Sequence, residues 1–188
     1  NQTLVGVVLD LAHELSHALS RPIWDPYDSR LTVGDYIFSA IEGKGGEIEA
    51  VKVECQVGIE LVAAGQKVDL SRCSRYQQNQ VIHENLVRED FYRVGSWYSY
   101  LETRLGKELS RFPSLSSKVP QLYSSTGNSP YPVALLREYE ELTWVACENS
   151  RKRLQTLKNR TIASTVIASD SEKLVREFLR YRCSSVPL

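Results

Sequence analysis

The sequence predicts a mainly helical α+β domain with a small or reduced sheet. Apolar residues recur at helical spacing through most of the chain, and convincing strand patterns are few. Turn-forming residues gather in two stretches, residues 22–46 and 113–132, and divide the helical segments. A chain of 188 residues is long enough to bury a core and fits one domain.

The first predicted helix covers residues 4–20, where Leu4, Val8, Leu11 and Leu15 continue one apolar face. Arg21-Pro22 ends it, because the residue before proline avoids helical backbone angles. We expect the apolar back of this helix to be buried, since a helix that carries a site must be held rigidly.

The next segments alternate between turns and helices. Residues 22–46 predict a loop or small hairpin, with Tyr36-Ile37-Phe38 as a short strand, and residues 47–64 predict a helix that stops at Gly65. The sequence then indicates a turn or short helix over residues 69–80. A helical stretch follows at 81–111, and its aromatic residues are expected in the core: Phe91, Tyr92, Trp97, Tyr98 and Tyr100.

The C-terminal part predicts one long loop and two helices. Residues 113–132 are rich in serine, proline and glycine and form the loop. Residues 133–158 form a helix with a charged face. Residues 170–182 form the last helix, with Asp170 as its N-cap.

The pentad His13-Glu14-Leu15-Ser16-His17 lies in the first helix and indicates a metal site. Histidines at positions i and i+4 share one helix face, so two ring nitrogens can hold one Zn²⁺. Glu14 projects beside that face, where it can take a proton from water.

This run, extended to Ala18 and preceded by Leu11-Ala12, resembles the zincin metallopeptidases. The resemblance implies that His13 and His17 are zinc ligands and that Glu14 is the catalytic base. It also implies an active-site helix followed by a second, ligand-bearing helix. Zincins usually have a small sheet before the motif helix. Only 12 residues precede His13 here, so we expect that sheet to be missing, reduced or supplied by other segments.

A zincin site needs a third ligand. The metzincin pattern is excluded, because Ser20 and Ile23 occupy the positions of its glycine and histidine. In the helix over 47–64, Glu47, Ala50 and Glu54 share a face, and this spacing resembles the ligand helix of the gluzincin group. We assign Glu47 as the third ligand and Glu54 as a hydrogen-bond acceptor for a ligand histidine; the two roles are exchangeable. The alternatives are Glu49, Asp25, Asp28 and Asp35.

The oxyanion formed in peptide hydrolysis needs a further donor. His83, the third histidine of the chain, is the first candidate, and Tyr123 and Tyr131 beside the long loop are the others. The expected organisation is a single metallopeptidase domain over residues 1–188. Residues 1–65 form its zinc-site core, and residues 66–188 shape the substrate groove.

Composition limits the partners. Lysine plus arginine and aspartate plus glutamate number 23 each, so nothing indicates a nucleic acid partner. No apolar run reaches the ~18 residues that a membrane span requires. The four cysteines, Cys55, Cys73, Cys147 and Cys183, lack zinc-knuckle spacing and are compatible with two disulfides or with free thiols.

The expected function is zinc-dependent hydrolysis of peptide bonds in a protein or peptide substrate. Small size and the HELSHA run resemble bacterial secreted effectors and toxins, which implies delivery into a host cytoplasm or a rival periplasm. One alternative is a zinc hydrolase that cleaves peptidoglycan in the periplasm. Others are a non-catalytic domain stabilised by zinc and a helical module without metal.

Overall fold

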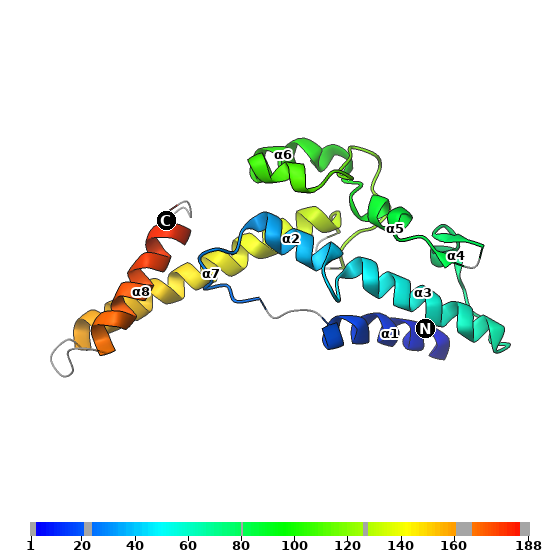
Figure 1. Cartoon of the computed structure of the whole chain (residues 1–188), viewed down its shortest axis with the longest axis horizontal. Coiled ribbons are helices and arrows are strands. Elements are labelled where there is room, and N and C mark those ends of the chain that lie inside the picture. The colour runs from blue at the N-terminus through cyan, green and yellow to red at the C-terminus, as the bar shows by residue number, and fades with distance from the viewer. Residues whose placement is uncertain (1–2, 21–23, 80, 126–127, 161–166, 185–188) are drawn as a thin grey trace. The chain divides into compact units, whose positions relative to one another are not determined.

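A computed structural model of the chain describes residues 3–20, 24–79, 81–125, 128–160 and 167–184. Within these ranges the protein is mainly helical and has one two-stranded antiparallel sheet (Figure 1), so the predicted fold class is confirmed. The chain packs as two compact units. The first comprises residues 1–23 and 33–135, and the second comprises residues 24–32 and 136–188. The predicted division at residue 65 falls inside the first unit.

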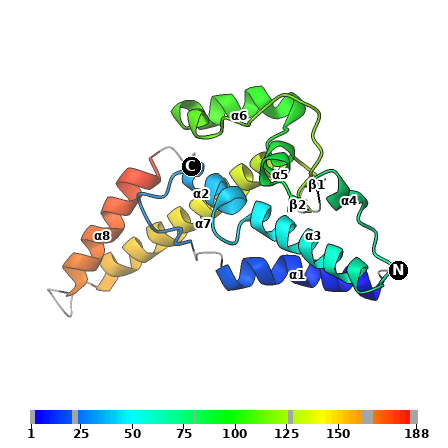
Figure 2. The ribbon, with the colours of Figure 1, turned by 45° about the vertical axis from the view of Figure 1, so that its right-hand side comes forward.

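Two helices of the first unit pack side by side. Helix α1 (Leu4–Ser20) lies along helix α3 (Glu47–Ala63) in both views (Figures 1 and 2). Both helices have the bounds that the sequence predicts to within a residue. The residues predicted to end α1, Arg21 and Pro22, lie outside the described residues. Ala50 on α3 is fully buried, and such a small side chain permits close helix packing.

The apolar side of α1 is not covered as predicted. No residue of α1 is buried, and Leu4 and Leu19 each remain 81% exposed. The face that meets α3 is the one that carries the two histidines and Leu9, whereas Leu4, Val8, Leu11 and Leu15 are exposed. The expectation of a buried apolar back is therefore wrong for the residues that the structure describes.

The predicted strand at Tyr36-Ile37-Phe38 is also wrong, because these residues lie within helix α2 (Val33–Glu42). Tyr36, Ile37, Ala40 and Ile41 are all buried. Their spacing is helical, and burial at that spacing outweighs the local preference of three β-favouring residues for a strand.

The remainder of the first unit consists of short elements. A short helix lies within residues 69–80, as predicted, whereas the helical stretch predicted over residues 81–111 begins with a strand and is divided into four short helices. The sheet pairs Gln77 with Ile82 and Gln78 with Val81. Phe91 and Tyr92 are fully buried, whereas Trp97, Tyr98 and Tyr100 are only half-buried. The elements are α4 (Ser71–Ser74), β1 (Gln77–Gln78), β2 (Val81–Ile82), α5 (Glu84–Phe91), the 3₁₀ helix η1 (Gly95–Trp97), α6 (Tyr98–Leu105) and the 3₁₀ helix η2 (Gly106–Arg111).

Two long helices complete the chain. The predicted loop precedes α7 (Tyr131–Arg160), which begins in the first unit and continues into the second. Helix α8 (Ile167–Arg182) begins three residues before Asp170, so the prediction of Asp170 as N-cap is wrong. A carboxylate in the first turn still interacts favourably with the helix dipole. None of the described helices is long and apolar enough to cross a membrane.

All four cysteines form disulfides, which the sequence left open. Cys55 of α3 is bonded to Cys73 of α4, and Cys147 of α7 is bonded to Cys183 after α8. In the second unit, the Cys147–Cys183 bond belongs to a buried cluster with Ala146 and Phe178. Each compact unit therefore has its own covalent link.

A buried tyrosine links α2 to the segment after α5. The hydroxyl of Tyr92 donates a hydrogen bond to Oε1 of Glu42 (2.9 Å), and Arg88 Nε donates to Oε2 of the same carboxylate (2.8 Å). Burial raises the pKa of Tyr92, so its hydroxyl remains a donor.

We predict that Tyr92→Phe lowers the free energy of unfolding by about 1.5–2 kcal/mol, because it removes a hydrogen bond to a charged group. Urea denaturation followed by circular dichroism measures this change. The control Tyr123→Phe, at a tyrosine that is 49% exposed, should stay within about 0.5 kcal/mol of the parent chain. Equal effects of the two substitutions would contradict the assignment.

Candidate metal centre

Helix α1 presents His13 and His17 on the face that meets α3. The two residues are one helical turn apart, and their ring centroids are 4.9 Å from each other. Both side chains are mostly shielded, with 14% of each exposed. The helical spacing thus places two imidazoles side by side, as the sequence predicted.

Glu47, the first residue of α3, faces both rings. Its Oε2 lies 3.5 Å from Nε2 of His13, and its Oε1 lies 3.7 Å from Nε2 of His17. The three side chains offer ligand atoms that all lie within 4.8 Å of one another. Glu47, which the sequence analysis selected as third ligand, therefore faces the Nε2 atoms of both histidines.

The other ring nitrogen of each histidine has an acceptor. Nδ1 of His17 lies 2.7 Å from the carbonyl oxygen of Gly45, and Nδ1 of His13 lies 3.0 Å from Oε2 of Glu54. Carbonyl and carboxylate oxygens only accept, so both Nδ1 atoms carry the hydrogen. The Nε2 atoms are the ones aimed at Glu47. Metal-binding histidines show this same arrangement, with the second nitrogen donating to a protein oxygen.

The turn before α3 positions the carbonyl oxygen of Gly45, which is one of these two acceptors. Gly45 adopts a φ of +66°, a conformation that side chains with a Cβ rarely take. Its N–H donates a hydrogen bond to Oε2 of Glu49 at 2.6 Å, while its carbonyl oxygen accepts one from Nδ1 of His17. Glu49 thus stabilises the turn, and it is not a member of the three-residue group.

The residues present fit a zinc ion. Oε2 of Glu47 is buried and has no hydrogen-bond partner among the described residues, which is costly unless a cation or water completes it. Ligands about 2.0–2.1 Å from a tetrahedral zinc lie roughly 3.4 Å from one another. Nε2 of His13 lies 3.5 Å from Oε2 of Glu47, and Nε2 of His17 lies 3.7 Å from Oε1, each close to that value. With one ligand atom per residue, the three atoms lie within 4.8 Å of one another, so a small inward shift would complete the coordination.

The facing carboxylates also favour a positive charge between them. Interactions with Glu47, and then with Glu54, raise the pKa of His13 to about 9, against the opposing effect of burial. The carboxylate of Glu54 is 10% exposed, and its Oε1 lies 3.6 Å from Nη1 of Arg72. Glu54 therefore joins His13 to an arginine on α4.

The rival aspartates are engaged elsewhere. Asp35 pairs with Arg111 at 2.7 Å. Asp25 and Asp28 belong to the second unit and accept hydrogen bonds from the backbone N–H groups of Tyr27 and Arg30, respectively. Neither they nor Asp35 belong to the group formed by the histidines and Glu47.

Tyr131 interacts with Glu47 of the histidine–glutamate group, although the sequence analysis favoured His83 over Tyr131 as the oxyanion donor. It is the first residue of α7, and its ring packs edge-on against Phe91 at 4.8 Å. Burial, the charges of Glu47 and Glu14 and a hydrogen bond to Glu47 raise the pKa of Tyr131 to about 12. Tyr131 is thus the tyrosine whose hydroxyl is most affected by Glu47, and the charge of Glu14 adds a smaller effect on its pKa.

The other predicted catalytic residues are exposed. Glu14 is exposed on α1. His83 is the exposed N-cap of α5, where its backbone N–H donates to the carbonyl of Tyr76 at 2.8 Å. Tyr123 is 49% exposed in the long loop. The group around Glu47 does not include His83 or Tyr123.

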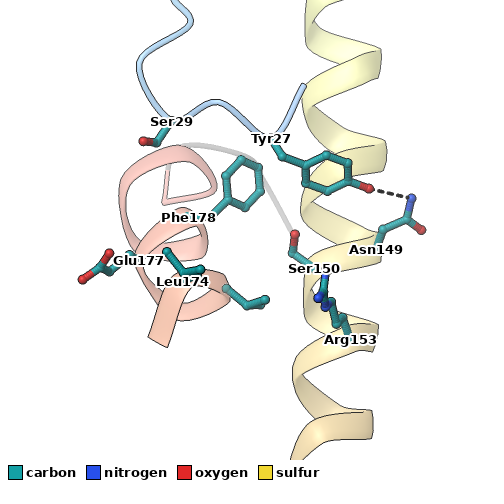
Figure 3. A pocket seen from close by; sticks show the side chains of 9 residues that line it. Tyr27, Ser29, Asn149, Ser150, Arg153, Leu174, Glu177 and Phe178 are labelled. Carbon is teal, nitrogen blue, oxygen red and sulfur yellow. Dashed lines mark hydrogen bonds between the residues drawn. The ribbon is translucent and has the colours of Figure 1, made fainter. Parts of the chain in front are cut away.

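A pocket in the second unit contains none of the predicted site residues. It has a volume of about 350 Å³ and lies between α7 and α8 (Figure 3). Tyr27 and Phe178 form its apolar side, with ring centroids 5.7 Å apart, and Asn149 and Arg153 contribute polar atoms. The sequence predicted the two helices on either side of this pocket. It did not predict the pocket itself, because the residues that line it belong to no recognisable motif.

Comparison with known proteins gives no match: no family model, no curated protein and no solved structure resembles the chain significantly.

Proposed function

We propose that the protein is a zinc-dependent metallopeptidase that hydrolyses peptide bonds in a protein substrate. One observation carries the proposal: Nε2 of His13 and Nε2 of His17 face the Glu47 carboxylate, while both Nδ1 atoms are held by protein oxygens. A set of two imidazoles and one carboxylate suits zinc and leaves a fourth position open. The resemblance of the HELSHA run to the zincins agrees with this arrangement.

The contacts of Glu54 support an open site over a closed, purely structural one. A closed site needs a fourth protein ligand, and Glu54 is the second carboxylate on α3 that contacts His13. Its two oxygens face Nδ1 of His13 and Arg72 instead. In that position Glu54 orients the imidazole of His13, which is how a carboxylate behind a ligand histidine acts.

The proposed mechanism divides the chemistry between the metal and two side chains, Glu14 and Tyr131. Zinc, when bound by His13, His17 and Glu47, supplies a Lewis acid and lowers the pKa of water to about 7. Glu14 accepts the proton of the attacking water and returns it to the leaving amine nitrogen.

Tyr131 completes the proposed machinery. Its hydroxyl donates a hydrogen bond to the substrate carbonyl oxygen as negative charge develops there. The raised pKa of Tyr131 keeps the hydroxyl protonated for this role at neutral pH. We therefore assign to Tyr131 the oxyanion role that the sequence gave first to His83.

Cleavage of peptide bonds in peptidoglycan is the second candidate function. The two disulfides favour an oxidising destination such as the periplasm over a reducing cytoplasm. Of the two expected destinations for a secreted effector or toxin, we therefore favour the periplasm. Peptidoglycan is a substrate available there, and periplasmic proteins are the other.

We predict that the chain binds one zinc ion and that His17→Ala raises its Kd at least about 100-fold, because a direct ligand matters more than a supporting residue. Competition with a chromogenic chelator measures the Kd. The matched control is His83→Ala, which removes the one histidine outside the group and should leave the Kd within about twofold. A parent chain that binds no zinc, or equal losses in both variants, would contradict the proposed centre.

Glu14→Gln tests the catalytic proposal. It should lower kcat at least about 100-fold while zinc stays bound, because the amide cannot accept a proton. Mass spectrometry of digests of periplasmic proteins and of purified peptidoglycan measures activity and identifies the substrate class. Full activity of the zinc-loaded variant on either substrate would eliminate Glu14 as the base.

Tyr131→Phe separates substrate chemistry from metal binding. It should lower kcat about 100-fold through loss of one oxyanion donor, with KM and zinc Kd within about twofold of the parent. Steady-state kinetics on the peptide identified with the parent enzyme provides the measurement. A change confined to zinc affinity would show that Tyr131 only supports Glu47.

A further inference from the structure

The Cys55–Cys73 disulfide lies directly behind the proposed metal centre. Cys55 follows Glu54 on α3, and Cys73 follows Arg72 on α4. Both cysteines are buried, with exposures of 0% and 3%. The covalent bond therefore joins the two residues that stand next to the Glu54–Arg72 ion pair.

A line of three side chains runs from this bond to the centre. Nη1 of Arg72 lies 3.6 Å from Oε1 of Glu54, and Oε2 of Glu54 lies 3.0 Å from Nδ1 of His13. Nε2 of His13 in turn faces Glu47. Arg72 thus fixes the carboxylate that orients one of the two imidazoles.

Besides the disulfide, Leu70 attaches this segment to α3, because its side chain lies against Gly58; Arg72 itself is held weakly. Its side chain is 46% exposed, and ion pairs of such exposed groups are weak by themselves. Helix α4 has four residues, too few for a helix to be stable alone. Between residues 62 and 75 the structure shows one buried residue, Cys73. The next anchor is Tyr76, whose hydroxyl donates to Oδ2 of Asp90 at 3.2 Å.

We propose that the Cys55–Cys73 disulfide controls metal affinity, so that the centre binds zinc tightly only when this bond is formed. The inference rests on the proposed zinc centre and adds its regulation. Without the bond, α4 separates from α3, Arg72 leaves Glu54, and the carboxylate no longer holds the ring of His13. Loss of such a supporting contact typically weakens metal binding 10–100-fold.

The chemical step is a thiol–disulfide exchange. The two cysteine thiols lose two protons and two electrons to a small-molecule disulfide, which is reduced to two thiols. The chain would thus have a weak centre in a reducing compartment and a strong one after transfer to an oxidising compartment. Cys147–Cys183 belongs to the second unit, and neither of its cysteines is a sequence neighbour of Glu54 or Arg72.

The decisive experiment compares two double variants of the full chain. Cys55→Ala/Cys73→Ala should raise the zinc Kd at least about tenfold, whereas Cys147→Ala/Cys183→Ala should leave it within about twofold. Alanine variants are preferred to a reductant, because free thiols bind zinc themselves. Competition with a chromogenic chelator gives the Kd, and circular dichroism verifies folding.

Each outcome decides the inference. A tenfold loss in the first variant alone supports it, and an unchanged Kd or equal losses in both variants overturn it while the zinc centre stands. A parent chain that binds no zinc overturns the zinc centre and this inference together.

Single substitutions of arginine provide a second test if the cysteine variants fold poorly. Arg72→Gln should raise the zinc Kd about threefold or more, and Arg72→Lys should restore part of the affinity by keeping the charge. Arg75→Gln is the matched control, since Arg75 lies on the same segment but pairs with Asp90 at 3.1 Å. Equal Kd values for Arg72→Gln and Arg75→Gln would overturn the role given to Arg72.

Discussion

Two hydrogen bonds behind the histidines control the geometry of the proposed centre. Gly45 and Glu54 accept from the Nδ1 atoms of His17 and His13, and so direct both Nε2 atoms towards Glu47. Either ring could otherwise rotate and present the wrong nitrogen. The acceptors come from the turn before α3 and from its second turn, so the packing of α1 on α3 is the constraint on which the centre depends.

The balance of charge around the histidines explains why this arrangement suits a cation. Glu47 and Glu54 both face His13, and Arg72 compensates only the outer oxygen of Glu54. One buried oxygen of Glu47 lacks a hydrogen-bond partner among the described residues. A proton on His13 relieves part of this negative charge, as its raised pKa shows, and a divalent ion would relieve more.

Sequence periodicity was sufficient for the parts of the centre that depend on local spacing. The i, i+4 histidines and the shared face of Glu47 and Glu54 follow from helix geometry alone, and the structure brings all four side chains together. Tyr131 and the cysteine pairs depend on tertiary packing, and no local pattern reports that. The strand predicted at residues 36–38 failed for the same reason, because burial by distant elements determined its conformation.

Anomalous diffraction at the zinc edge, from crystals grown with zinc, locates an ion bound between α1 and α3. We predict one strong peak about 2.0–2.2 Å from Nε2 of His13, Nε2 of His17 and a carboxylate oxygen of Glu47, with a fourth position open to solvent. Imidazoles turned apart with no peak between them, or an ion coordinated by Nδ1 atoms, would contradict it.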